Sequence, residues 1–248
     1  MAVVLVFIGL VWVVWDKAKT YETDAAPIKY VRTEGVFEHI SKEEVKKTLQ
    51  PLVKTGFFSA DMQAIKRAVL QMPWIDRVSV KRVWPDAIDI KVYEQTAYAR
   101  WGKKSLLNER GEIFTPANAG EFGHLPLVNG PSGQEQKVLE IMKGIRTTLA
   151  DQAMELVEFS INDRRSWKIV LANGTEILLG RKDQLKHFQR FLKTLVLFEQ
   201  EQINAIATVD LRYPNGYAVS WKPDTAAIDW KKIAEGQQQS QQAKTKAL

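Results

Sequence analysis

The fold of the first half of this chain is decided by residues 73–92, PWIDRVSVKRVWPDAIDIKV. Val78 and Val80 alternate with polar neighbours, and residues 88–92 repeat that alternation after residues 84–86. Alternation with a period of two is typical of a β-strand with one buried face, and Trp-Pro-Asp has the composition of a turn. The stretch therefore predicts a β-hairpin.

Two amphipathic helices are expected before this hairpin, and one strand before them. Ser41 begins the first helix with a capping-box signature, because Glu44 follows three residues later. Asp61 caps the second helix, which ends at Pro73. With a strand at residues 28–36, the order β-α-α-β-β predicts two helices on one face of a three-stranded sheet. The positions expected to face the sheet are Val45, Leu49, Leu52, Val53, Met62, Ile65, Val69 and Met72.

A second module with shorter strands follows from residue 97. Its loop at residues 115–133 is rich in Pro and Gly, and Asn173-Gly174 are favoured residues of a two-residue hairpin loop. The expected elements are a helix with Val138, Ile141, Met142, Ile145 and Leu149 on one face, strands at residues 156–161, 167–172 and 175–179, a helix at residues 183–201 with Leu185, Phe188, Leu192 and Leu195 inward, an alternating strand at residues 205–213, and a last strand carrying Tyr217, Val219 and Trp221.

The predicted fold class is α+β. A first domain at residues 28–95 precedes a β domain of antiparallel strands with flanking helices at residues 96–225, and a polar tail with the run QQQSQQ occupies residues 226–248.

The N-terminus carries an apolar run, AVVLVFIGLVWVVW, at residues 2–15. A membrane-spanning helix needs about 20 apolar residues, so the run is short for one. Trp12 and Trp15 stand at its charged end, and indole rings favour the membrane interface. We therefore expect a transmembrane anchor at residues 1–20, truncated at its N-terminus, and a linker at residues 21–27. The alternatives are a cleaved signal peptide and a buried core helix.

Composition and motifs exclude more chemistry than they suggest. The net charge is +6, but acids and bases are interspersed and nucleic-acid-binding motifs are missing, so no nucleic-acid partner is expected. The chain has no cysteine, and His39, His124 and His187 lack metal-ligand spacing. Glu109 and Glu112 flank a turn, where acids are ordinarily solvated. No catalytic residue, metal or cofactor is therefore expected, and a cell-wall hydrolase is disfavoured.

The final hairpin gathers residue types that dominate binding hot spots, namely Arg212, Tyr213, Tyr217 and Trp221. Alternation predicts that Arg212 faces outward, where it can pair with a partner's carboxylate, and places Tyr213 on the core side. Tyr217 and Trp221 are equally compatible with a core role. Arg164 belongs to a second basic corner, Arg164-Arg165-Ser166-Trp167, which also suits a plain charged turn. A late strand at a sheet edge can be extended by a partner strand.

Several motifs in order resemble one family of proteins. They are Pro73-Trp74-Ile75, Val78-Ser79-Val80, Arg82-Val83-Trp84-Pro85-Asp86, Ala99-Arg100-Trp101, Leu125-Pro126, Gly130-Pro131, Arg164-Arg165-Ser166-Trp167 and Val209-Asp210-Leu211-Arg212-Tyr213. Together they resemble the FtsQ family of bacterial cell-division proteins. The resemblance implies a single-pass inner-membrane protein at the division septum, whose periplasmic bulk comprises a POTRA domain, the β-α-α-β-β unit, and a β domain.

The resemblance also implies partners and binding residues. An FtsB-type protein, in a coiled-coil complex with an FtsL-type protein, would add a strand to the last β-strands, and FtsK-, FtsW- and FtsI-type proteins are further expected partners. The implied contact residues are Arg164, Arg212, Tyr213, Asn215, Gly216, Tyr217 and Trp221 for the FtsB-type protein, and Val80 and Arg82 for recruitment through the POTRA domain. Asn215 occupies a position where the family can have serine, and Pro214 and Tyr217 also depart from the expected pattern.

Two function classes follow from these observations. The expected function is a non-enzymatic scaffold that links early and late division proteins. The alternative is an outer-membrane assembly or secretion component that handles unfolded chains, which should have tandem POTRA repeats or a barrel. The sequence contains one β-α-α-β-β unit and too few later strands for a barrel.

Overall fold

The computed structural model describes residues 27–195 and 198–223. The chain divides into two compact units between Thr96 and Ala97. The expected anchor, all but the last residue of the expected linker and the expected tail lie outside the described residues. Within the described part, none of the helices has the length and apolar character needed to cross a membrane.

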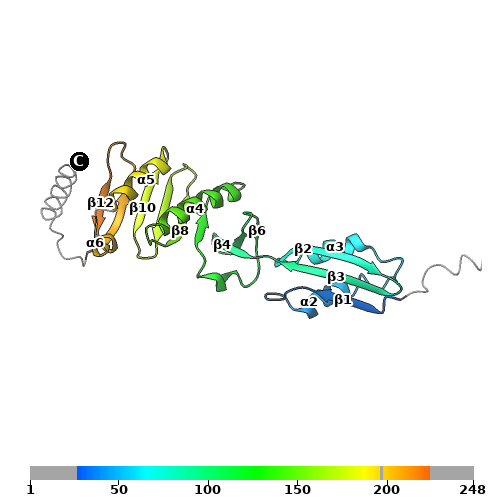
Figure 1. Ribbon diagram of the computed structural model, residues 1–248. Helices are drawn as coiled ribbons and strands as arrows, with labels where there is room; N and C mark the ends of the chain where they lie inside the picture. Colours follow the sequence, from blue (N-terminus) through cyan, green and yellow to red (C-terminus); the bar gives the residue numbers. More distant parts are fainter. Residues whose placement is uncertain (1–26, 196–197, 224–248) are drawn as a thin grey trace, which may run out of the picture. The chain divides into compact units, whose positions relative to one another are not determined.

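The first unit is a three-stranded sheet with two helices. Its elements are β1 (Tyr30–Glu34), α2 (Lys42–Leu49), α3 (Met62–Leu70), β2 (Ile75–Val83) and β3 (Ala87–Glu94). The strand order is β1-β3-β2, in which β1 runs parallel to β3 and β2 runs antiparallel to it. Helix α3 lies beside β2, and helix α2 lies beside β1 (Figure 1). The predicted β-α-α-β-β order is confirmed.

Local sequence signals explain where the helices of this unit begin and end. The Ser41 side chain accepts from the amide of Glu44, whose carboxylate accepts from the amide of Ser41, so the predicted capping box forms. Asp61 caps α3 through the amides of Gln63 and Ala64. Because α2 ends at Leu49, the expected apolar positions Leu52 and Val53 lie in the following turn and are only half-buried.

The second unit is built on a larger sheet. Its strands are β4 (Ala97–Trp101), β5 (Ser105–Asn108), β6 (Ile113–Phe114), β7 (Leu127–Asn129), β8 (Leu156–Ile161), β9 (Trp167–Leu171), β10 (Glu176–Gly180), β11 (Ile206–Asp210) and β12 (Ala218–Trp221). Its helices are the 3-10 helix η1 (Ala119–Phe122) and α4 (Glu135–Ala150), α5 (Gln184–Leu195) and α6 (Gln200–Ala205). Among the described residues the strand order is β12-β11-β10-β9-β8-β7-β4-β5-β6, with β12 at one edge.

The expectation that this sheet is antiparallel is wrong for several strand pairs. Strand β7 runs parallel to both β4 and β8, and β11 runs parallel to β10. Helical crossovers account for two of these pairs, since α4 connects β7 to β8, and α5 and α6 connect β10 to β11, while β5, β6 and η1 lie between β4 and β7. Such a crossover lets a chain return parallel to the strand it left. The predicted meander of β8, β9 and β10 is antiparallel, as expected.

Helices α4 and α5 cover one face of this sheet (Figure 1). Met142 of α4 and Phe188 of α5 belong to one apolar cluster with Phe159 and Ile177 of the strands. The predicted helix at residues 183–201 is in fact two helices, α5 and α6. Leu185 is 51% exposed rather than inward, whereas Phe191, which was not among the expected inward positions, is buried.

Candidate functional site

The site begins where β11 ends at Asp210. The Asp210 carboxylate accepts a hydrogen bond from the amide of Arg212 at 3.0 Å, which turns the chain away from the strand direction. The amide of Leu211 makes the last link to β10, at 2.8 Å from the carbonyl oxygen of Leu178. Tyr213 therefore lies beyond the strand and is 54% exposed. The expectation that Tyr213 faces the core is wrong, because alternation holds only as far as the strand continues.

Arg212 is exposed, as alternation predicted, and is held by Asp210. Its Nε and Nη2 donate to the two carboxylate oxygens at 2.8 and 2.6 Å. The Arg212 side chain is 58% exposed and that of Asp210 only 16%. The hydrogen bond from Arg212 is the main cause that lowers the pKa of Asp210. The carboxylate thus fixes the guanidinium in one orientation at the surface.

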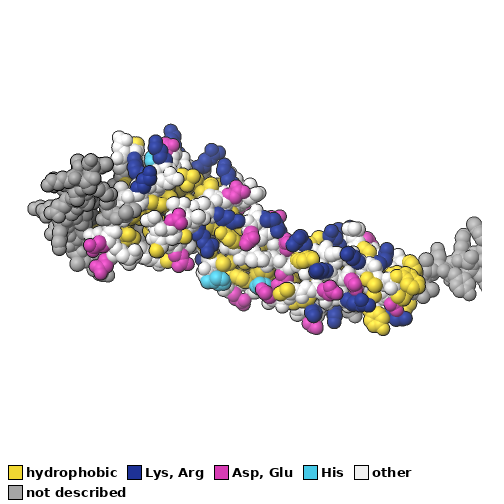
Figure 2. Space-filling view, viewed as in Figure 1, with side chains coloured by type: hydrophobic (Ala, Val, Ile, Leu, Met, Phe, Trp, Pro, Cys, Tyr) yellow, Lys and Arg dark blue, Asp and Glu magenta, His cyan; other side chains and the backbone are white. Residues whose placement is uncertain are grey.

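A groove of about 630 Å³ joins the two basic corners that the sequence singled out. Arg164, in the turn between β8 and β9, and Arg212 both line it. The groove is also lined by Asn162, Ser166, Leu179, Gly180, Arg181, Lys182, Asp183, His187 and Pro214. Lys and Arg side chains gather around α5 on the face of this unit seen in Figure 2. The groove therefore offers several cations to an acidic ligand.

Helix α5 supports the loop between β11 and β12 through four side chains. Arg190 donates to the carbonyl oxygens of Pro214 at 3.0 Å, Gly216 at 3.4 Å and Tyr213 at 3.5 Å. The other three contacts are made by His187 with the Leu211 carbonyl, Phe191 with the Tyr217 ring, and Thr194 with the Tyr217 hydroxyl. These residues were missed by sequence reasoning. The spacing 187, 190, 191 and 194 is that of one helix face, and it is the signal that could have found them.

The remaining hairpin residues differ in exposure. Asn215 is exposed, whereas Gly216 is half-buried beside Arg190. The Tyr217 hydroxyl lies 2.6 Å from Thr194 Oγ1, and its ring meets Phe191 edge-on at 5.5 Å. Trp221 packs against the core cluster. Tyr217 and Trp221 thus shape the hairpin from within, while Tyr213 and Asn215 face solvent.

Strand β12 is the last strand at one edge of the sheet formed by residues 97–195 and 198–223. Among the described residues, β11 is the only strand that pairs with it. The amide of Lys222 donates to the Ala205 carbonyl at 2.9 Å, so this amide points toward the sheet. Because successive amides of a strand point in opposite directions, the amide of Val219 points away from β11. The edge can therefore accept another strand.

Val80 and Arg82 belong to the first unit. Val80 is half-buried in β2 and pairs with Ile90 of β3. Arg82 is exposed, and its Nη2 donates to the carbonyl oxygens of Phe58 and Ala60 at 3.2 and 2.5 Å. Arg82 therefore ties strand β2 to the loop before α3.

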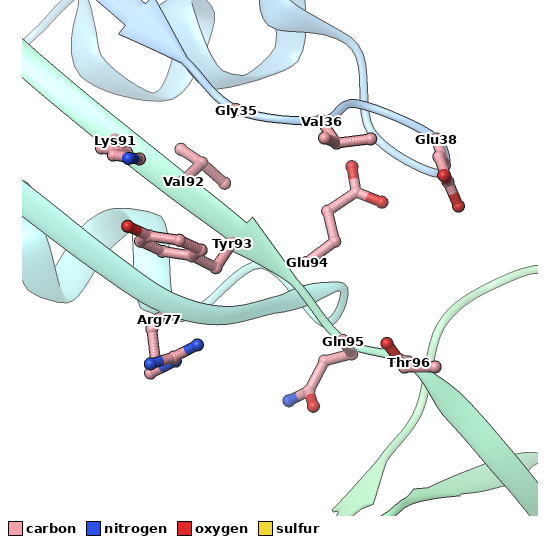
Figure 3. A pocket seen from close by; sticks show the side chains of 10 residues that line it. All are labelled: Gly35, Val36, Glu38, Arg77, Lys91, Val92, Tyr93, Glu94, Gln95 and Thr96. Atoms are coloured by element: carbon pink, nitrogen blue, oxygen red, sulfur yellow. The ribbon is translucent and has the colours of Figure 1, made fainter.

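A second hollow, of about 350 Å³, lies in the first unit (Figure 3). The ring of Tyr93 has Arg77 at 4.9 Å and Lys91 at 5.4 Å from its centre. The carboxylate of Glu94 accepts from the amides of His39 and Ile40 at 3.0 and 3.3 Å. Tyr93 and Glu94 of this hollow are thus held by neighbouring groups. The sequence patterns did not predict the hollow.

Glu109 and Glu112, the acidic residues noted beside a turn, lie between β5 and β6. The Glu112 carboxylate accepts from Asn108 at 2.7 Å and from Arg110 at 2.6 Å. These hydrogen bonds lower the pKa of Glu112, with that from Arg110 the larger cause. A general acid needs a raised pKa, so Glu112 is poorly suited to glycoside hydrolysis.

Comparison with known proteins adds to this geometry. The family described as cell division protein FtsQ/DivIB, C-terminal, matches residues 99–212, and the POTRA domain, FtsQ-type, matches residues 26–95. Cell division protein FtsQ of Methylomonas methanica is 51% identical over 224 residues, which cover 90% of this chain and 90% of that protein. The FtsQ proteins of Xanthomonas campestris and Coxiella burnetii are each 32% identical, covering 78% and 79% of this chain and 69% and 81% of their own lengths.

Proposed function

This chain belongs to the FtsQ family of cell division proteins, and we propose that it is a non-enzymatic scaffold of the bacterial division complex. In this proposal residues 2–15 belong to a single inner-membrane anchor, and the bulk of the chain lies in the periplasm at the septum. The scaffold links early and late division proteins, among them FtsB- and FtsL-type partners and FtsK-, FtsW- and FtsI-type proteins.

The observation that carries the proposal is the position of β12 at the sheet edge, within the part of the chain that the structure describes, beside the exposed residues Arg212 and Tyr213. Edge strands with unpaired backbone groups are templates for a partner strand. In this proposal the FtsB-type partner adds a strand to β12, and its backbone pairs with the amide of Val219, which points away from β11. Hydrogen bonds along the strand supply affinity, and side chains beside it supply specificity.

Specificity for the FtsB-type partner is proposed to come from the groove lined by Arg164 and Arg212 and from the loop between β11 and β12. Arg212 and Arg164 line one groove and can each pair with a carboxylate of the partner. Tyr213 is exposed and offers an aromatic surface that a partner can bury. Asn215 and Gly216 complete the loop, while Tyr217 and Trp221 hold it in shape. The partner segment should therefore be an extended strand flanked by acidic residues.

The first unit is proposed to serve recruitment. Val80 and Arg82 lie on β2, an edge strand of its sheet among the described residues. The Arg82 guanidinium donates hydrogen bonds to two carbonyl oxygens. We therefore propose that Arg82 contributes to recruitment both by holding this surface in shape and by its charge. The outer-membrane alternative is not proposed, since the POTRA match covers one unit and the second match is to the FtsQ/DivIB family.

Charge reversal at Arg212 tests the proposal. We expect Arg212→Glu in the full chain to weaken capture of the FtsB-type partner at least about 100-fold, or about 2.7 kcal/mol, because a carboxylate beside Asp210 repels an acidic segment. Capture is measured on immobilised partner complex. Tyr213→Glu should have a similar effect, because it places a charge where the partner is proposed to bury the aromatic ring.

The matched control is Arg146→Glu, which reverses an exposed charge on α4 of the same unit. It should bind like the unaltered chain. Circular dichroism and thermal unfolding must show that all variants are folded. Normal capture by a folded Arg212→Glu chain would refute the interface.

A further inference from the structure

An exposed aromatic cluster stands at one end of the first unit. Trp84 in the β2–β3 turn is 78% exposed, Phe58 is 61% exposed and Tyr30 is 58% exposed. Figure 2 shows hydrophobic side chains gathered at the end of the unit where the described chain begins. We call Tyr30, Phe58 and Trp84 the aromatic tip. Large aromatic side chains grouped in water mark a contact surface on a protein.

Backbone contacts show that the three segments of the aromatic tip meet. The Arg82 side chain, two residues before Trp84, donates to the carbonyl of Phe58 at 3.2 Å. The amide of Tyr30 donates to the carbonyl of Asp86, two residues after Trp84, at 3.3 Å. The Trp84 turn is therefore linked to the other two segments by these hydrogen bonds.

Cations surround the aromatic tip. Lys29, Lys81 and Arg82 are exposed, and Lys29 neutralises the neighbouring Asp86 at 3.1 Å. A surface with exposed aromatic rings and a basic rim suits the interfacial layer of a membrane. Tryptophan and tyrosine rings favour that layer, and anionic headgroups attract lysine and arginine.

The sequence before the first unit points to the membrane as the surface that the aromatic tip contacts. The described chain starts at residue 27, directly before β1, and only residues 16–26 separate it from the apolar run at residues 2–15. Eleven residues reach at most about 40 Å when fully extended. The aromatic tip thus cannot lie far from the bilayer in which that run is proposed to be anchored.

We propose that the aromatic tip docks on the periplasmic surface of the membrane, an inference that rests on the proposed anchor. Trp84 and Phe58 then lie at the depth of the lipid headgroups, while Lys81 contacts lipid phosphates. The other end of β1, near Val36, lies six residues from Tyr30, or about 20 Å along the strand, and stays in water.

The absence of cysteine from the chain makes a site-specific test practical. The full chain is reconstituted in vesicles of phosphatidylethanolamine and phosphatidylglycerol, with one spin label at Trp84→Cys or Phe58→Cys. The matched control is Val36→Cys, because the Val36 side chain is 71% exposed in the same unit. Power saturation then compares collisions of each label with oxygen, which partitions into lipid, and with a water-soluble nickel chelate.

We expect the ratio of oxygen to nickel accessibility to be several-fold higher at positions 84 and 58 than at position 36. Equal ratios at all three positions in a chain that floats with the vesicles would overturn the docking and leave the anchor intact. A chain that does not float would overturn the anchor itself. Shielding of position 84 that arises only when other division proteins are added would identify the aromatic tip as a protein-binding surface instead, and would also overturn the proposal.

Discussion

Asp210 and Arg212 show how one pair of residues sets the geometry of the candidate interface. The carboxylate is mostly buried and holds both the amide and the guanidinium of Arg212. Arg212 is therefore preorganised before any partner arrives, which reduces the entropy lost on binding. The same carboxylate competes with the partner's carboxylates for the guanidinium.

The pH dependence of folding should report this pair. Because the pKa of Asp210 is lowered in the folded chain, its contribution to stability is fully present above the unfolded value of about 3.9 and is lost as pH falls through the lowered folded value. The contribution should be at most about 1 kcal/mol, since Arg212 is largely exposed. The measurement is the free energy of unfolding by urea as a function of pH, for the unaltered chain and for Asp210→Asn.

The difference between these two curves isolates Asp210 from other carboxyls with a lowered pKa, such as Glu112 and Asp61. The unaltered chain should lose its advantage in the acid range, where the curves converge. Curves that stay parallel across that range would contradict the assignment of the stabilisation to this carboxylate.

Arg190 should control partner binding without touching the partner strand. Its guanidinium donates to three carbonyl oxygens of the loop at residues 213–216. Arg190→Met keeps the apolar stem and removes the donors, so we expect capture of the FtsB-type partner to weaken about 10-fold, or about 1.4 kcal/mol. The midpoint of thermal unfolding should change little, because the carbonyls freed in this way are near the surface and can bind water.

Arg190→Lys is the control for charge, because it keeps the cation and loses the planar group that reaches several carbonyls. Its affinity should lie between those of the unaltered chain and Arg190→Met. If Arg190→Met bound the partner normally, the loop would need no support from α5.

Residue patterns predicted some of this site and missed the rest for physical reasons. Arg212 was expected to be exposed because it alternates with buried positions. Tyr213 was misplaced because the side chain of Asp210 turns the chain, and alternation alone does not reveal a turn made by a side chain. Arg190 was missed because the helical spacing that it shares with His187, Phe191 and Thr194 indicates a common helix face but does not reveal which carbonyls, 24 residues away, that face meets.

At the scale of elements, strand β12 carries the proposed function through its backbone. Proline lacks the amide hydrogen, and is tolerated in an edge strand where that hydrogen faces solvent. Val219→Pro removes an amide that points away from β11, whereas Ser220→Pro removes one that faces β11. We expect Val219→Pro to weaken capture at least about 10-fold, because a strand-pairing hydrogen bond is lost and the ring obstructs the incoming strand.

Thermal unfolding and capture, measured on both proline variants, separate the two effects. Val219→Pro should remain folded with a small loss of stability, while Ser220→Pro should lower the unfolding midpoint by disturbing the β11–β12 pairing. A folded Val219→Pro chain that captures the partner as well as the unaltered chain does would exclude strand addition at this edge.

The sequence predicts which helices and strands form more readily than which strands pair with each other. The hairpin of β2 and β3 and the meander of β8, β9 and β10 follow from alternation and turns between sequence neighbours. The parallel pairing of β11 with β10 depends on the path of α5 and α6 over the sheet. No local pattern records that path, so the mixed character of the sheet became visible only in the structure.

At the scale of the whole molecule, the division into two units was accessible from the change of pattern near residue 97. Among the residues that the structure describes, the main apolar cluster of the second unit contains none before Tyr98. The groove, the β11–β12 loop and strand β12 all lie in this unit.

The fragment of residues 97–223 should therefore fold alone and bind the FtsB-type partner within about twofold of the affinity of the full chain. The affinity is measured by titration calorimetry against the same partner complex, and folding is checked by cooperative thermal unfolding. Tyr213→Glu in the fragment is the control, and it should weaken binding at least about 100-fold, as we expect in the full chain. A fragment that unfolds cooperatively yet binds more than about 10-fold more weakly would mean that the first unit contributes directly to partner capture, and the proposed division of labour between the units would then be wrong.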